Sequence, residues 1–194
     1  MDRAKMEAGI RTFLEGIGER ARGDDLERTP ARVAAAWMDD LLAGYAVDPV
    51  AELSWVPAME PKGPVLARDI RFVSVCVHHL LPFTGLAHVA YLPAERLAGL
   101  SKLGRVVDAH ARRLQIQETL TGDIAATLER ALAPAAALVV LEAEHTCMTL
   151  RGVRKEGSRL LTYAATGRWS EDAAARREIL DLIAPGRRPL LSNA

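Results

Sequence analysis

The sequence predicts an α+β fold in which helices pack on one face of a mainly antiparallel sheet. Three observations support this prediction. Apolar residues repeat at helical spacing near the N-terminus, runs rich in β-branched residues begin near residue 69, and two helical stretches separate the first strands from the later ones. This order of elements is typical of an α+β fold rather than of a chain that alternates strands and helices.

The N-terminal part of the chain is expected to be helical. Residues 3–17 carry apolar side chains at helical spacing, which predicts a first helix. Thr29 is a natural N-cap and Pro30 a natural first helical residue, so a second helix is expected from there to Gly44. Several prolines between residues 46 and 64 predict a connecting segment.

The main body is expected to follow this segment. We predict an N-terminal helical region and linker over residues 1–58, and a larger domain over residues 59–194 that ends in a helix and a loose tail. A turn or loop over residues 80–85 is expected to join the first two strands. The predicted strands cover 69–77, 86–93, 137–145, 147–153 and 159–167, and the predicted helices cover 100–114, 115–133 and 171–184.

The composition argues against several classes of function. Apolar residues make up 49% of the chain, and 25 basic residues balance 25 acidic ones. Because a nucleic-acid-binding protein usually carries a basic excess, no nucleic-acid partner is expected. The N-terminus lacks the apolar core of a signal peptide and the apolar runs are too short to span a bilayer, so no membrane partner is expected. Two cysteines are too few for a disulfide scaffold, which favours a cytoplasmic protein.

Two short segments, far apart in the sequence, each combine cysteine with histidine. If the chain turns between Cys76 and His79, their side chains converge, and in a strand His145 and Cys147 would share one face. Two thiolates and one imidazole form a catalytic zinc set whose fourth position is left for water. His78 and His145 would remain as spare imidazoles beside the metal, where they could transfer protons.

This pattern has two simpler explanations. Free cysteine is among the most buried residue types, so both cysteines could be inert core residues. They could also form one disulfide, which a reducing compartment disfavours. Four cysteine and histidine residues in two short clusters favour a metal site over both explanations, and thiolate ligands favour zinc over magnesium or calcium.

Five segments resemble the signature blocks of the GTP cyclohydrolase I family. They are SVCVHHLLPFTGLAHVAYLP, GLSKLGRVV, RRLQIQETLT, EAEHTCMTLRGV and, near the N-terminus, RTPARVAAAW. The resemblance covers roughly residues 26–183 and implies a T-fold, or tunnelling fold. It also implies a homodecamer of two face-to-face pentamers with active sites at subunit interfaces. The implied reaction converts GTP and water to 7,8-dihydroneopterin triphosphate and formate, the first step of folate and pterin biosynthesis.

The resemblance also implies a role for each matching residue. The zinc ligands would be Cys76, His79 and Cys147, with His145 protonating the guanine ring and His78 serving later proton transfers. Glu118, assisted by Gln117, would accept N–H bonds from the base, and a buried acceptor of this kind discriminates against adenine. Ser101 would act with the catalytic histidines and also line the triphosphate site, whose cationic ligands would be Lys102, Arg105, Arg151 and Arg32.

Three positions depart from the family's usual pattern. Val77 stands where the family usually has glutamate, Ala35 replaces a lysine of the N-terminal helix motif, and Tyr163 lies in a strand that usually carries small hydroxyl residues. Losing one charged phosphate contact costs roughly 1.5–3 kcal/mol. These departures keep open a specialised or non-catalytic paralogue that binds a purine nucleotide or stops at an intermediate. A T-fold nitrile reductase with a cysteine nucleophile is a third alternative, against which the second cysteine and the Cys-x-x-His pattern argue.

Overall fold

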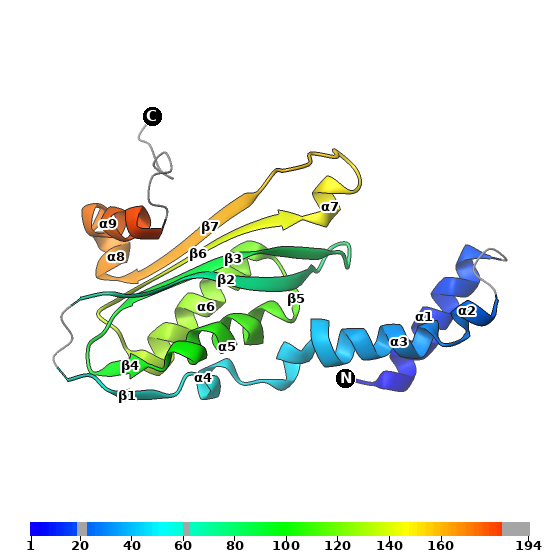
Figure 1. Ribbon diagram of the computed structural model, residues 1–194, viewed down its shortest axis with the longest axis horizontal. Coiled ribbons are helices and arrows are strands. Elements are labelled where there is room, and N and C mark those ends of the chain that lie inside the picture. Colours follow the sequence, from blue (N-terminus) through cyan, green and yellow to red (C-terminus); the bar gives the residue numbers. More distant parts are fainter. Residues whose placement is uncertain (19–22, 60–62, 184–194) are drawn as a thin grey trace.

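The computed structural model describes residues 1–18, 23–59 and 63–183 (Figure 1). Its centre is a five-stranded sheet with the strand order β5-β2-β3-β6-β7. Neighbouring strands are antiparallel except β5, which runs parallel to the end of β2. The strands are β2 (Val65–Cys76), β3 (Pro82–Leu92), β5 (Leu114–Gln115), β6 (Ala136–His145) and β7 (Leu160–Gly167). The predicted α+β fold with a mainly antiparallel sheet is confirmed.

Helices cover both faces of this sheet, but unequally. The long helices α5 (Leu100–Ala111) and α6 (Gln117–Leu132) lie along one face, whereas α8 (Arg168–Glu171) and α9 (Ala173–Ile183) cover one end of the other (Figure 1). Two separate hydrophobic clusters result, one on each side of the sheet. The opposite face is therefore open at the end of the sheet that α8 and α9 do not reach.

Strand β6 is apolar at consecutive positions because both of its faces are covered. Val139 and Leu141 belong to the cluster beneath α5 and α6, and Leu138 and Val140 belong to the cluster beneath α8 and α9. Successive side chains of a strand point to opposite faces, so a strand covered on both sides needs apolar residues at every position. All four side chains are at most 1% exposed.

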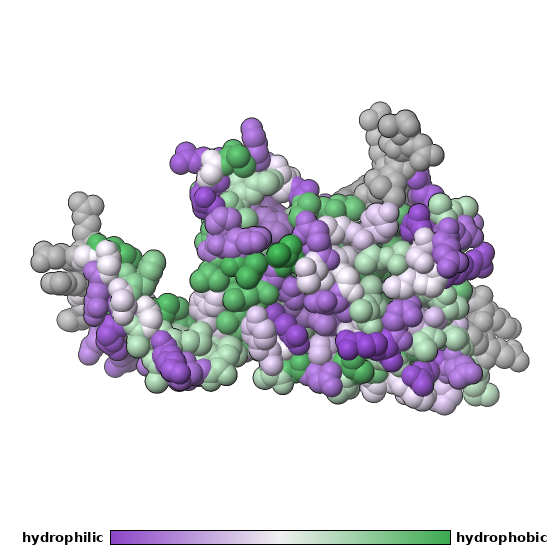
Figure 2. Space-filling model, turned by 180° about the vertical axis from the view of Figure 1, so that it is seen from behind, coloured by the Kyte–Doolittle hydropathy of each residue, from purple (hydrophilic) through white to green (hydrophobic). Residues whose placement is uncertain are grey.

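The N-terminal segment forms an arm that stands away from the body (Figures 1 and 2). Within it, α1 packs mainly against α3, and no residue of α1 is buried. A small sheet of β1 and β4 then joins the connecting segment to the body. The elements are α1 (Arg3–Ile17), α2 (Asp24–Glu27), α3 (Thr29–Ala35), the π-helix η2 (Ala36–Leu41), the 3-10 helix η3 (Ala43–Ala46), α4 (Pro49–Glu52), β1 (Trp55–Pro57) and β4 (Arg96–Ala98).

The helix predicted from Thr29 to Gly44 differs from the observed one at both ends. Thr29 is already the first helical residue, so the cap position falls on Arg28, and no side chain caps this end. The helix passes into a π-helix and then a 3-10 turn that contains Gly44. A Cβ at Gly44 would lie 2.5 Å from the carbonyl oxygen of Ala109. Glycine is therefore required here for close contact with α5 rather than for ending a helix.

The structure corrects two predictions near the ends of β3 and β6. Strand β3 begins at Pro82, so the predicted loop over residues 80–85 is mostly strand. The strand predicted over residues 147–153 is wrong, because the chain forms the short helix α7 (Thr146–Thr149) there. The last pair of the β3–β6 ladder is Phe83 with His145, so β6 has no partner beyond that point.

The predicted C-terminal helix is present as α9, preceded by α8. The whole predicted loose tail, residues 185–194, lies outside the described residues, as do residue 184 of the predicted helix and residues 60–62 of the predicted connecting segment. Among the helices that the structure describes, none combines the length and the apolar composition needed to cross a membrane.

Candidate metal centre and active site

The first half of the candidate site is a tight turn at the end of β2. Cys76 is the last residue of the strand and is 7% exposed. Its backbone N–H donates to the carbonyl oxygen of Leu81, and its own carbonyl accepts from the N–H of Leu80. The turn brings two imidazoles back over the thiol, with Nδ1 of His79 at 3.8 Å and Nδ1 of His78 at 4.0 Å from Sγ.

The second half comes from α7, which follows β6. Because β3 pairs with β6, the register that joins Phe83 to His145 places the start of α7 beside the turn. The ligand atoms of Cys76, His79 and Cys147 all lie within 4.8 Å of one another. The two distant segments therefore meet, although not through the shared strand face that the sequence predicted. His145 ends a strand and Cys147 lies in a helix, so the two do not share a strand face.

The chemistry of this group fits a soft divalent cation. A tetrahedral zinc site with these donors has ligand atoms about 3.5–3.8 Å apart, which is close to the separation of Sγ and Nδ1 in Cys76 and His79. Burial raises the pKa of the Cys147 thiol, and the neighbouring Cys76 raises it further. A cation between the two sulfurs would reverse this effect, since it favours both thiolates. Both cysteines are free of disulfide bonds.

His145 is held firmly beside this group. Its ring stacks on Phe83 with centroids 4.3 Å apart and an angle of 8° between the planes. Its Nε2 lies 2.8 Å from Oε1 of Gln117. Burial lowers the pKa of His145, and the nearby carboxylate of Glu118 acts in the opposite direction. His78, by contrast, is exposed in the turn.

Gln117 and Glu118 are consecutive in the first turn of α6 but face different surroundings. Glu118 is exposed, and its negative charge is favourable near a helix N-terminus. Gln117 is 0% exposed, and both ends of its side-chain amide are bonded to protein atoms. In this chain Gln117 is bonded within the protein, and its predicted contact with a substrate base stays a prediction. The sequence offered no sign of this difference, because both residues are polar.

Most of the residues predicted to bind a triphosphate lie away from Cys76. Ser101, Lys102 and Arg105 lie in the first turns of α5, a helix of 12 residues and thus about 18 Å long. The far end of α5 leads into β5, whose Gln115 pairs with Cys76. The three residues are therefore at the distant end of the helix, and Arg105 forms an ion pair with Glu52 at 3.5 Å.

The remaining two predicted cations are exposed. Arg151 lies two residues after the end of α7, and its charge is near enough to Cys147 to act against the rise of that thiol's pKa. Arg32 lies in α3 on the N-terminal arm. Within one chain, the structure thus brings together the sulfur and imidazole groups, Gln117, Glu118 and Arg151, and leaves the other cations apart.

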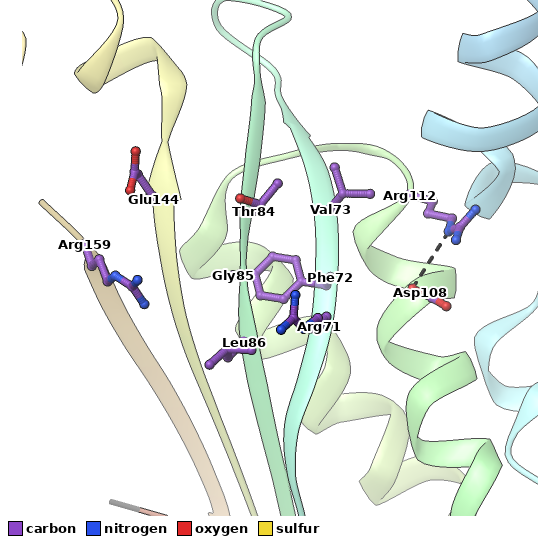
Figure 3. A pocket seen from close by; sticks show the side chains of 10 residues that line it. All are labelled: Arg71, Phe72, Val73, Thr84, Gly85, Leu86, Asp108, Arg112, Glu144 and Arg159. Carbon is purple, nitrogen blue, oxygen red and sulfur yellow. Dashed lines mark ion pairs between the residues drawn. The ribbon is translucent and has the colours of Figure 1, made fainter. Parts of the chain in front are cut away.

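A cavity of about 650 Å³ lies away from these residues, against β2 and β3 (Figure 3). None of the predicted site residues lines it. Its charged groups come from several elements, and two of them, Asp108 and Arg112, form an ion pair at 3.8 Å. Its lining consists of Arg71, Phe72, Val73, Thr84, Gly85, Leu86, Asp108, Arg112, Glu144 and Arg159.

The fold and the site define an α+β protein with a Cys-His-Cys group that could hold a metal ion beside a half-buried histidine. The family model for GTP cyclohydrolase I matches residues 6–184. The chain belongs to the GTP cyclohydrolase I family.

Curated relatives cover almost the whole chain. GTP cyclohydrolase 1 of Geobacillus kaustophilus is 48% identical over 93% of this chain and 96% of its own. The protein of the same name from Rhodopirellula baltica is 47% identical over 94% of this chain and 80% of its own, and that from Pelotomaculum thermopropionicum is 46% identical over 94% and 97%. Among solved structures, the apo form of the archaeosine synthase QueF-Like aligns with a TM-score of 0.46 and 19% identity, over 55% of this chain and 95% of that one.

Proposed function

We propose that the protein is a zinc-dependent GTP cyclohydrolase I, which converts GTP and water to 7,8-dihydroneopterin triphosphate and formate, the first step of folate and pterin biosynthesis. The observation that carries the proposal is the convergence of Cys76, His79 and Cys147 beside His145, in a chain of this family. The two free cysteines support a reducing cytoplasm as its location.

Three residues would hold the zinc ion: Cys76 and Cys147 through sulfur, and His79 through Nδ1 or Nε2. Zinc bound in this way supplies an activated water for attack on the ring carbon between the two imidazole nitrogens of guanine. The turn after β2 and the start of α7 after β6 hold the three ligands at one end of the sheet, where β3 pairs with both β2 and β6, which limits their movement.

The two further histidines suit proton transfer for different reasons. His145 is half-buried and clamped by Phe83, so it would protonate the guanine ring from a fixed position and make the attacked carbon more electrophilic. His78 is exposed in a turn, so it can approach groups that appear later, such as the opening ribose. The later steps need this freedom because the reacting atoms change position.

Glu118 is the residue proposed to recognise the base. Its carboxylate is exposed and close enough to His145 to influence its pKa. A carboxylate accepts the two N–H groups on the guanine edge, and adenine would leave it partly unpaired. The resulting discrimination favours GTP over ATP.

We propose that other subunits complete the triphosphate site. Ser101, Lys102 and Arg105 lie at the far end of α5 from Cys76, so they would serve the site of a neighbouring copy. The outer edge of β7 is unpaired among the described strands, which allows sheets of neighbouring chains to join. Figure 2 also shows apolar surface on the body beside the N-terminal arm. A homodecamer of two pentamers is the proposed assembly, with Arg32 and Arg151 as further phosphate ligands.

A non-catalytic relative is the second candidate. Val77, which stands where the family usually has glutamate, is 40% exposed beside Cys76. A carboxylate would fit there without disturbing the hydrophobic core, yet the chain has valine. Ala35 gives the N-terminal arm no positive charge at the position where the family usually has lysine. Such a protein would bind a guanine nucleotide or stop at an intermediate.

The test is turnover of GTP by purified protein, followed as formate release and pterin fluorescence, with zinc content measured on the same sample. Cys147→Ser is expected to lose zinc and activity together. Met148→Leu, a volume-conserving change at the next residue, is expected to keep both. Zinc-loaded protein that binds GTP and releases no formate would support the second candidate instead.

A further inference from the structure

We infer that Gln117 is a positioning residue, which makes Nε2 of His145 the nitrogen that carries hydrogen and leaves Nδ1 free to exchange a proton with substrate. The inference rests on the proposed function, since it assigns a role in the same reaction. It gives Gln117 a role other than the predicted contact with the base, because this side chain is 0% exposed.

The orientation of the Gln117 amide follows from its surroundings. Its Nε2 lies 3.2 Å from the carbonyl oxygen of Leu141, 3.0 Å from that of Leu160 and 3.0 Å from Oγ1 of Thr162. Backbone carbonyl oxygens only accept hydrogen bonds. The reversed amide would place an oxygen against two carbonyl oxygens in a buried site, which is strongly unfavourable.

The hydroxyl groups nearby agree with this orientation. Thr121 donates to the backbone carbonyl of Gln117 at 2.7 Å, so its hydrogen is already used. The contact of 2.6 Å between Thr121 and Thr162 therefore has Thr162 as donor. The oxygen of Thr162 is then left to accept from the Gln117 amide. In this arrangement each of the two hydroxyl groups donates one hydrogen bond, and no two donors face each other.

The hydrogen on His145 follows in turn. Because the amide nitrogen of Gln117 faces its three acceptors, Oε1 is the atom that faces His145, and Nε2 of the imidazole must donate across the 2.8 Å contact. A neutral imidazole has only one N–H, so its Nδ1 carries the lone pair and must take up a proton before His145 can protonate the guanine ring. The stacked ring of Phe83 holds the imidazole in the plane that this bond requires.

A purely structural role is the competing explanation, since Gln117 also links α6 to β6 and β7. The two roles differ in what they affect. A structural link would change stability, metal content and substrate binding together. A positioning residue acts on the proton-transferring group, so its loss lowers kcat and leaves KM nearly unchanged.

The test uses Gln117→Met, which is similar in size but lacks the amide. This variant is expected to lower kcat for GTP about 10- to 100-fold, as for other partners that orient an imidazole, with KM and zinc content close to wild type. The control is Thr127→Val, which removes a buried hydrogen bond from the same helix, to His110 at 2.8 Å. It is expected to retain wild-type kcat.

A second readout is independent of turnover. Histidine labelled with ¹⁵N in the ring, in the zinc-loaded protein at pH 8, reports which nitrogen of His145 carries hydrogen, and loss of signals in His145→Asn assigns them. Hydrogen on Nε2 is expected. An unprotonated Nε2 in the wild type, or Gln117→Met with unchanged kcat, would overturn the inference. If zinc-loaded wild type releases no formate, the proposed function fails, while the ring signals still test the hydrogen bond.

Discussion

Acidification should destabilise the protein through one buried histidine. His110 on α5 is 5% exposed, and its Nε2 lies 2.8 Å from Oγ1 of Thr127 on α6. Its Nδ1 is buried without a hydrogen-bond partner among the described residues. Burial, assisted by the charges of Arg113 and Arg130 and opposed by that of Asp123, lowers the pKa of His110 from 6.5 to about 4.

The direction and size of the change in stability follow from the difference in the pKa of His110 between the folded and unfolded states. Between pH 6.5 and about 4 the unfolded chain binds a proton at this residue and the folded chain does not. Stability is therefore complete above pH 6.5, falls as the pH drops through this window and levels off below it. A difference of roughly 2.5 pKa units corresponds to about 3 kcal/mol at most, of which about 2 kcal/mol is lost between pH 7 and pH 5.

The assay is urea denaturation at several pH values and one protomer concentration, with wild type compared to His110→Phe. Other titrating groups and metal release affect both proteins, so they cancel in the difference between the two pH profiles. The variant is expected to lose about 2 kcal/mol less than wild type between pH 7 and pH 5. Parallel profiles would refute the assignment of this loss to His110.

Two further predictions concern close packing and base recognition. Gly44→Ala is expected to cost about 2 kcal/mol or more of unfolding free energy, because the new Cβ would lie 2.5 Å from the oxygen of Ala109. Gly16→Ala, with nothing within 4 Å, should instead stabilise by about 0.5–1 kcal/mol, and equal effects of the two changes would contradict this reasoning. Glu118→Gln should lower kcat/KM for GTP about 100-fold, since it weakens two charge-assisted bonds. Thr119→Ala is its exposed control, and an undiminished preference for GTP over ATP in Glu118→Gln would exclude the proposed role.

Local periodicity was sufficient to predict most of the elements. The helix predicted over residues 3–17 is present with those bounds, and the two central helices and β6 are close to their predicted ranges. These segments have a regular pattern of apolar residues, which arises from one face packing on the core. The apolar pattern of α6 alone places Leu120, Ile124 and Leu128 in the core, where they are 0% exposed.

The errors fall where a distant partner decides the local structure. The segment over residues 147–153 has residues suited to a strand, but the β3–β6 ladder stops at Phe83 and His145, so none of the described strands pairs with it. Gln117 and Glu118 are adjacent and polar, yet only Gln117 meets the oxygens of Leu141 and Leu160. Nothing near these residues in the sequence indicates either partner.

The sequence by itself determined the α+β class, the long helices and the supply of sulfur and imidazole groups, because these depend on composition and short-range spacing. Only the tertiary structure decided that Cys76 and Cys147 meet, that Gln117 is enclosed beside His145, and that Ser101 lies far from both. The physical reason is that strand pairing between β3 and β6 sets these distances, and pairing joins residues that are remote along the chain.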